Sequence, residues 1–158
     1  MSVITARQIQ VRRLKEEDQP LLEQMYDEFV PHGVALGLPP RDAARRRAWL
    51  AQLREGLNLV AFVDGTLTGH LALMPIEGRG EMAVFVRQDF RRQGIATTLT
   101  QAAVEEARAM GLAAIWVLID SSNMAARHGL VKFGFLAEWE DLREAQMVFP
   151  LDQPGRKS

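Results

Sequence analysis

The chain has 158 residues, of which 47% are hydrophobic and 25% are charged, and its formal net charge is −1. These values fit one globular domain with a hydrophobic core, and the small net charge gives no general attraction to nucleic acid or to an anionic membrane. The chain has no cysteine, which excludes disulfides, thiolate metal sites and a cysteine nucleophile. We see no apolar stretch of membrane-spanning length and no secretory leader, so we expect a cytoplasmic protein without nucleic-acid or membrane partners.

The N-terminal third of the chain predicts a strand followed by two helices. Alternating apolar residues predict a strand over 9–14, and Asp18 ahead of Pro20 predicts a capped helix that runs to about Phe29. A linker rich in proline and glycine follows. The next helix is predicted over 43–54, with its arginines on a solvated face.

The middle of the chain predicts consecutive antiparallel strands. The segments 57–63 and 67–74 flank Asp64-Gly65, a pair that favours a tight hairpin turn, and Gly69 is a candidate bulge. A third strand is predicted over 81–86.

The C-terminal half predicts alternating helices and strands. An apolar stripe predicts a helix over 95–110, and the apolar run over 113–119 predicts a strand buried on both faces. Asn123 is expected to cap a short helix that ends near residue 132. A last strand over 145–151 is placed near a sheet edge, because Pro150 cannot donate to a strand ladder. We expect one domain over residues 1–152 and a flexible tail over 153–158.

The segment after Val86 is the most informative part of the sequence. An apolar strand ends there, a basic loop with Gly94 follows, and a helix begins. The first backbone N–H groups of a helix lack partners within the helix and attract anions, while Arg91 and Arg92 add charge-assisted donors suited to phosphate. The pattern predicts a pyrophosphate-binding loop, and a plain exposed turn before a surface helix is the alternative.

Two motifs and the element order resemble the GNAT superfamily of N-acetyltransferases. The run Arg91-Arg92-Gln93-Gly94-Ile95-Ala96 matches the family signature (Gln/Arg)-x-x-Gly-x-(Gly/Ala) after a strand. Downstream, Asn123-Met124-Ala125-Ala126 is followed by Phe133-Gly134-Phe135, which resembles the family's Asn-x-x-Ala segment and Gly-Phe ending. The resemblance implies an α/β (α+β) fold with a mixed, mostly antiparallel central sheet of about six to seven strands flanked by helices.

The resemblance also implies acetyl-CoA as the co-substrate, a primary amine of a small molecule or peptide as the acceptor, and no metal. The acetyl group would pass by direct attack of the amine on the thioester. The implied cofactor-binding residues comprise the end of the strand, the loop, the start of the helix and the downstream asparagine: Phe85, Val86, Arg91, Arg92, Gln93, Gly94, Ile95, Ala96, Thr97 and Asn123.

The catalytic candidates are Glu81, Ser122 and Asn123. Glu81 begins the strand beside the expected thioester, and relatives keep a catalytic carboxylate in this region, so we assign it as the base. A water relay, or a solvated glutamate without a catalytic role, are the alternatives. His70 on the neighbouring strand is a weaker candidate for proton relay. His32 and His128 are weaker still.

One departure from the family concerns the general acid. The position at which many members have a tyrosine that protonates the leaving thiolate is Leu130, and the one tyrosine of the chain is Tyr26. Water, or the hydroxyl of Ser121 or Ser122, would then serve as the acid. The departure also leaves a second hypothesis, a non-catalytic acyl-CoA-binding or regulatory module. A homodimer is a possible assembly.

Overall fold

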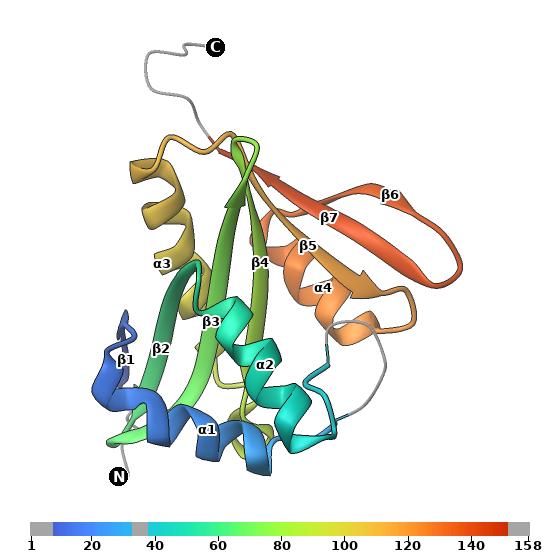
Figure 1. Ribbon diagram of the computed structural model, residues 1–158. Helices are drawn as coiled ribbons and strands as arrows, with labels where there is room; N and C mark the ends of the chain where they lie inside the picture. The colour runs from blue at the N-terminus through green and yellow to red at the C-terminus, as the bar shows by residue number, and fades with distance from the viewer. Residues whose placement is uncertain (1–7, 33–37, 152–158) are drawn as a thin grey trace, which may run out of the picture.

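The computed structural model describes residues 8–32 and 38–151 (Figure 1). Within these residues the strands are β1 Ile9–Arg13, β2 Leu57–Val63, β3 Thr66–Ile76, β4 Arg79–Val86, β5 Ala114–Asp120, β6 Leu136–Glu140 and β7 Glu144–Pro150. The helices are α1 Gln19–Glu28, α2 Ala43–Leu53, α3 Ile95–Ala109 and α4 Met124–Phe133, with short 3-10 turns η1 Glu16–Asp18 and η2 Gln88–Phe90. The tail predicted over 153–158 and part of the 31–40 linker lie outside the described residues.

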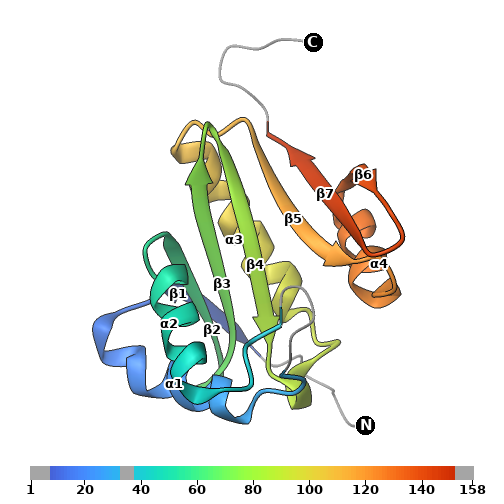
Figure 2. The same cartoon turned by 45° about the vertical axis from the view of Figure 1, so that its right-hand side comes forward.

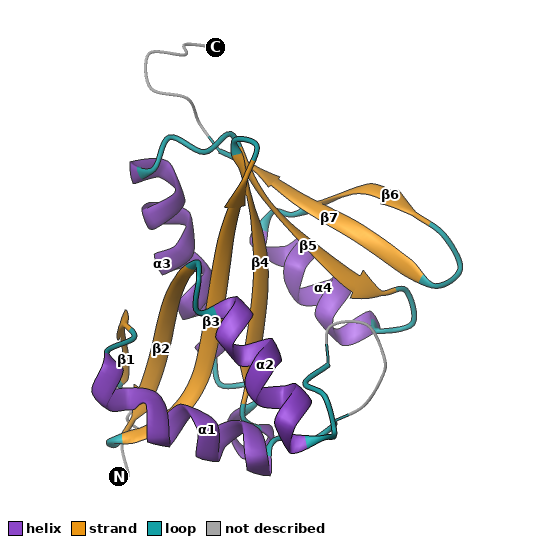
Figure 3. Cartoon of the chain, in the orientation of Figure 1, coloured by secondary structure: helices purple, strands orange, loops and turns teal. Residues whose placement is uncertain are grey.

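The strands form one seven-stranded sheet in the order β1-β2-β3-β4-β5-β7-β6. Strands β4 and β5 pair in parallel, and the other neighbouring pairs are antiparallel. Helices lie on both faces (Figure 3). The predicted mixed, mostly antiparallel sheet flanked by helices is therefore confirmed.

Each face of the sheet has its own hydrophobic core. Helix α3 packs against β1 to β5, and this core also receives residues of α4 such as Leu130 and Phe133. Helices α1 and α2 pack over β3 on the opposite face, where Leu22, Met25 and Phe85 belong to a second, smaller core. None of the helices in the described ranges combines the length and apolarity needed to cross a bilayer.

Strands β4 and β5 separate along their length. Their pairing covers three residue pairs, from Arg79 opposite Ala114 to Glu81 opposite Trp116. Beyond these pairs the two strands diverge, with β5, β7 and β6 turning away from β4 (Figures 1 and 2). The rest of β4, residues 82–86, therefore lacks a strand neighbour on its β5 side.

One prediction about the last strands is wrong. Strand β7 lies near the sheet edge, as predicted, but β6 pairs with its outer side and is itself the edge strand. Our sequence order had omitted β6, in which all five residues are exposed. A strand without a buried face has no alternating hydrophobic pattern to reveal it.

The strand predicted to be buried on both faces is fully covered on one face only. Ile115, Val117 and Ile119 of β5 pack in the core with α3, whereas Trp116 and Leu118 on the other face are half-buried. Helices α1 and α2 pack over β3, so their cover does not extend across this part of the sheet (Figure 1).

Two local predictions also change. Asp18 precedes α1, as predicted, but its carboxylate accepts hydrogen bonds from the Arg12 guanidinium at 2.7 and 2.9 Å and from Lys15 N–H at 2.8 Å, and it does not cap the helix. Arg46, which we had placed on a solvated face, is buried, with its guanidinium 2.6 Å from Asp27. A charged pattern in sequence does not show which arginine a distant carboxylate will bind.

Candidate functional site

The loop between β4 and α3 adopts the conformation that its glycine requires. Gly94 is the N-cap of α3 with φ of +83°, in the left-handed region, and Arg92 has φ of +64°. A Cβ at Gly94 would meet no atom within 4 Å. Arg92, Gln93, Ala96 and Thr97 are exposed, while Ile95 is buried and anchors the first turn. The first N–H groups of α3 thus begin at the surface, next to the gap between β4 and β5.

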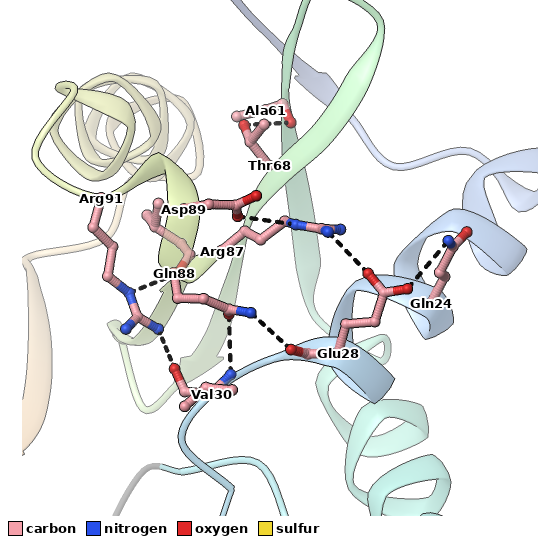
Figure 4. A network of polar contacts seen from close by, with 10 residues as sticks. Gln24, Glu28, Val30, Ala61, Thr68, Arg87, Gln88, Asp89 and Arg91 are labelled. Atoms are coloured by element: carbon pink, nitrogen blue, oxygen red, sulfur yellow. Dashed lines mark hydrogen bonds and ion pairs between the residues drawn. The ribbon is translucent and has the colours of Figure 1, made fainter.

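Arg91 has intramolecular partners on both sides of the loop. Its Nε donates to Val86 O at 3.0 Å and its Nη2 donates to Val30 O at 2.6 Å (Figure 4). Its guanidinium also lies 5.0 Å from the centre of the Phe29 ring. Partial burial lowers the pKa of this guanidinium. A role of Arg91 toward phosphate would therefore compete with its contacts to the segment after α1.

Gln88 makes a second connection between the loop and α1. Its side-chain amide donates to Glu28 O at 2.8 Å, and its side-chain oxygen accepts from Val30 N–H at 3.0 Å (Figure 4). Arg87 adds an ion pair with Glu28 at 2.9 Å. These contacts fix the end of β4 against the end of α1, and sequence analysis had not identified them.

The backbone groups of β4 alternate in direction. Arg87 directly follows β4, and its N–H donates to Thr68 O of β3. Residues two apart in a strand direct their backbone groups to the same side. The N–H groups of Met82, Val84 and Val86 therefore point away from β3, toward the side from which β5 has separated. Val84 was not among the predicted contacts, although the alternation would have indicated it once Val86 was chosen.

Phe85 is buried away from this gap. Its ring makes edge contacts with Tyr26, Phe29 and Trp49, with centroids 5.7, 5.8 and 5.3 Å away. By the same alternation its N–H group points to β3. Phe85 therefore packs the end of β4 against α1 and α2. Of the two predicted strand contacts, Phe85 and Val86, Val86 is the one whose N–H points into the gap.

Glu81 lies at the point where β4 and β5 separate. It is half-buried, is opposite Trp116 of β5 and Met74 of β3, and lies on the same face of β4 as Ala83 and Phe85. That face continues over the neighbouring strands, where Leu136 and Trp139 are 62% and 42% exposed. We call it the open face; its apolar and amide side chains on β5 to β7 are Trp116, Leu118, Leu136, Trp139, Gln146 and Val148.

Ser122 and Asn123 lie after β5 and are both hydrogen bonded. The Ser122 hydroxyl donates to Asp120 at 2.5 Å, and this bond lowers the pKa of the Asp120 carboxyl group. The carboxamide oxygen of Asn123 accepts from Ala126 N–H at 3.1 Å and caps α4, as predicted. A contact of Asn123 with a ligand would therefore come from its amide nitrogen.

Ser121, the other candidate hydroxyl, donates to Asp141 O at 2.8 Å. Asp120 had been missed, although a carboxylate directly after an apolar strand is a visible signal.

His70 is fully buried and cannot relay protons with solvent or substrate. Its Nδ1 lies 2.6 Å from the Tyr26 hydroxyl and its Nε2 lies 2.7 Å from Asn58 Oδ1. Burial lowers the pKa of His70 to about 3 and raises the pKa of Tyr26. The one tyrosine of the chain is therefore also unavailable as an acid.

The remaining histidines, His32 and His128, lie outside the strand that carries Glu81. His32 Nε2 is 2.6 Å from Tyr26 O, and His128 is exposed on α4. Leu130, at the position of the family tyrosine, packs against the core on the α3 face. The described residues contain no group of three or more histidine, cysteine, aspartate or glutamate side chains arranged to bind a metal.

A cavity lies along α3, between that helix and α4. Its volume is about 600 Å³, and its lining includes Thr97, Gln101, Arg108, Gly129 and Lys132. Thr97 belongs to the first turn of α3, so the cavity adjoins the N-terminus of that helix.

Comparisons with known proteins agree with this arrangement. A family model described as "Acetyltransferase (GNAT) family" matches residues 22–135, which span both motifs. The chain belongs to the GNAT acetyltransferase family. It is 35% identical, over 119 residues, to an L-methionine sulfoximine/L-methionine sulfone acetyltransferase from Pseudomonas paraeruginosa, an alignment that covers 69% of each protein. This GNAT protein is an acetyl-CoA-dependent N-acetyltransferase, as its motifs predicted.

Two solved structures show the same fold. An N-acetyltransferase from Staphylococcus aureus Mu50 matches with a TM-score of 0.74 and 22% identity, covering 92% of this chain and 99% of that one. An N-acetyltransferase from Thermoplasma acidophilum in complex with coenzyme A matches with a TM-score of 0.69 and 18% identity, covering 90% and 99%. The GNAT fold class is therefore confirmed.

Proposed function

We propose that this enzyme transfers the acetyl group of acetyl-CoA directly to the α-amine of a small polar amino acid. The observation that supports this most is the gap between β4 and β5, which opens beside the N-terminus of α3 and adjoins the open face at Glu81. The acceptor class follows the activity named for the Pseudomonas relatives, which are 34–35% identical to this chain.

The backbone of the loop is suited to the pyrophosphate of acetyl-CoA. In the proposal the N–H groups of residues 92–97 bind its oxygens, and Gly94 leaves the space that a side chain would fill. The amide-containing pantetheine arm would then bind the β5-facing backbone groups of β4, as an added strand would. The cavity between α3 and α4 adjoins this path on the same side of the sheet.

The acceptor would approach from the opposite side. Helix α3 covers one face of the sheet, so a cofactor bound at its N-terminus enters the gap from that side. The open face is on the other side, with Glu81 and Ala83 next to the gap. Cofactor and amine can therefore bind together, as direct transfer requires.

In the proposed reaction the amine nitrogen forms a bond to the thioester carbon, and the carbon–sulfur bond then breaks. The ammonium proton passes to Glu81 or to a water molecule beside it, because only the neutral amine attacks. The N–H of Val84 or Val86 stabilises the negative oxygen of the tetrahedral intermediate. As the thiolate leaves, the nitrogen loses its second proton, which passes to the thiolate through a water molecule or a hydroxyl; for Ser122 this requires release from Asp120.

Thiol release tests the function directly. We expect the protein to release CoA thiol from acetyl-CoA when L-methionine sulfone or L-methionine sulfoximine is added, and to release less with peptides and polyamines. Thiol release with other amines but not with amino acids would contradict the acceptor class. Acetyl-CoA binding without thiol release for any amine would leave the acyl-CoA-binding module as the better description.

Glu81→Gln is expected to lower kcat with little change in the KM for acetyl-CoA. The variant keeps the size of the side chain but cannot accept a proton, and the loss should grow at low pH, where less of the amine is neutral. pH–rate profiles of both proteins measure this. Glu77→Gln is the control, since Glu77 is exposed in the turn between β3 and β4. Parallel profiles for parent and Glu81→Gln would remove Glu81 from the mechanism.

The proposal also retains a cytoplasmic location, the absence of nucleic-acid and membrane partners, and a possible homodimer as predictions from the sequence. Gel filtration and cell fractionation are the measurements that address them.

A further inference from the structure

We infer that Arg79 binds an oxygen-bearing group of the acceptor, a carboxylate or a sulfone, on the open face of the sheet. The inference rests on the proposed function, because it requires the acceptor amine to lie beside Glu81. It goes beyond that function by assigning a specificity-determining residue.

Arg79 lies on the open face, close to Glu81. It is two residues before Glu81 in β4, so the two side chains project from the same face with Cα atoms about 7 Å apart. Strands β4, β5, β6 and β7 contain no other lysine or arginine. Arg79 is therefore the one positively charged side chain of these four strands that an acceptor oxygen could contact.

The hydrogen-bonding capacity of the Arg79 guanidinium is incompletely used. Its Nη2 donates to Glu138 Oε1 at 3.0 Å, while its Nε is buried without a hydrogen-bond partner, the one such side-chain nitrogen or oxygen among the described residues. Nε and Nη2 form the two prongs of a planar fork. A group with two oxygens, such as a carboxylate or a sulfone, matches both prongs, whereas Glu138 uses one.

The present partner of Arg79 can be exchanged for a ligand. The Arg79 and Glu138 side chains are 34% and 38% exposed, and exposed ion pairs contribute little to stability. Glu138 Oε1 also accepts from Gln146 at 2.7 Å, so it keeps a hydrogen bond if Arg79 turns to an acceptor. The pair orients the guanidinium over the open face until the acceptor binds.

Three acceptors and two variants test the inference. L-methionine sulfone has both oxygen groups, L-methionine lacks the sulfone oxygens, and 3-(methylsulfonyl)propylamine lacks the carboxylate. We expect Arg79→Gln to lower kcat/KM for L-methionine sulfone about 10- to 100-fold, mainly by raising KM. For the analogue that lacks the oxygen group bound by Arg79, the same variant should change kcat/KM less than about 3-fold. The insensitive analogue identifies that group. Arg79→Lys should restore part of the loss, because it keeps the charge but not the fork.

The control is Arg127→Gln. Arg127 lies in α4, on the opposite face of the sheet, and forms an ion pair with Glu140 of β6 at 2.7 Å. It therefore resembles Arg79 in pairing with a glutamate of β6, but it lies away from the open face. It should leave the ratios between acceptors unchanged, and no variant should change the KM for acetyl-CoA. Equal losses for all three acceptors in Arg79→Gln would mean a structural role and would overturn the inference.

A binding measurement separates this inference from the proposed function. If the parent releases thiol with none of the three acceptors, the acceptor class is wrong for turnover. Thermal shifts of the CoA-saturated proteins with L-methionine sulfone then decide about Arg79. A larger shift for the parent than for Arg79→Gln supports the inference, and equal shifts, including none, overturn it.

Discussion

Gly94→Val is expected to raise the KM for acetyl-CoA at least about 10-fold and to remove the thermal stabilisation that the cofactor gives. A ligand that binds only the folded state adds about 2.7 kcal/mol at a hundredfold excess over its Kd, so the loss is readily measured. The reason is the backbone: Gly94 has φ of +83°, which a β-branched residue adopts only with strain of roughly 1–2 kcal/mol or more. The loop would relax and move its N–H groups.

Gly65→Val is a matched control for this experiment. Gly65 has φ of +78° in the hairpin between β2 and β3, and a Cβ there, as at Gly94, would meet no atom within 4 Å. Both variants should therefore lose similar intrinsic stability, while only Gly94→Val should lose acetyl-CoA binding. If both proteins keep the thermal response of the parent, the loop is not the pyrophosphate site.

The free energy of unfolding is expected to fall by roughly 2 kcal/mol between pH 6.5 and pH 4.5 because of His70 alone. Burial, with a smaller contribution from the charge of Arg54, lowers the pKa of folded His70 to about 3, whereas an unfolded histidine titrates near 6.5. In this window the unfolded chain binds a proton that the folded chain does not, so stability falls as the pH falls. Denaturant unfolding at several pH values measures the slope.

The hydrogen bonds around His70 explain why the neutral form is required. Asn58 Nδ2 donates to Leu53 O and Gly56 O, so its Oδ1 accepts from His70 Nε2, and the Tyr26 hydroxyl donates to Nδ1. A second proton on the ring would displace the tyrosine hydrogen bond inside the core. The lowered carboxyl pKa values, such as about 2 for Asp18, act mainly below about pH 5, so they overlap with only the lowest part of this window.

The variants for this test are His70→Gln and His128→Gln. His70→Gln should be less stable than the parent at pH 7 but should lose the His70 part of the slope, about 1.4 kcal/mol per pH unit at most. His128 is exposed on α4, so its removal should leave the slope unchanged. A slope that is the same in all three proteins would show that His70 does not titrate with the predicted shift.

The parts of the site that sequence predicted are local in origin. The loop at Gly94 follows from a glycine that allows a positive φ and from the start of an amphipathic helix, both of which depend on neighbouring residues. The cap by Asn123 is local for the same reason, since its side chain binds a backbone group three residues ahead. Such features appear in the sequence at fixed spacing.

The parts that were missed depend on residues far apart in the chain. Arg91 was assigned to phosphate from its type, but its hydrogen bond to Val30 joins residues 61 positions apart. The unpartnered Nε of Arg79 likewise depends on Glu138, which is 59 positions away on a strand that we had not predicted. No local pattern contains this information.

By itself the sequence determined the family, the order of most strands and helices, and the position of the glycine loop before α3, because hydrophobic periodicity, glycine and capping residues act over a few positions. Only the tertiary structure decided how β4 and β5 separate beyond Glu81 and Trp116, which face of the sheet stays open, and that His70 and Tyr26 are enclosed in the core. The physical reason is that these properties come from packing between distant segments, whose free energies depend on the complete set of neighbours and not on the residue type alone.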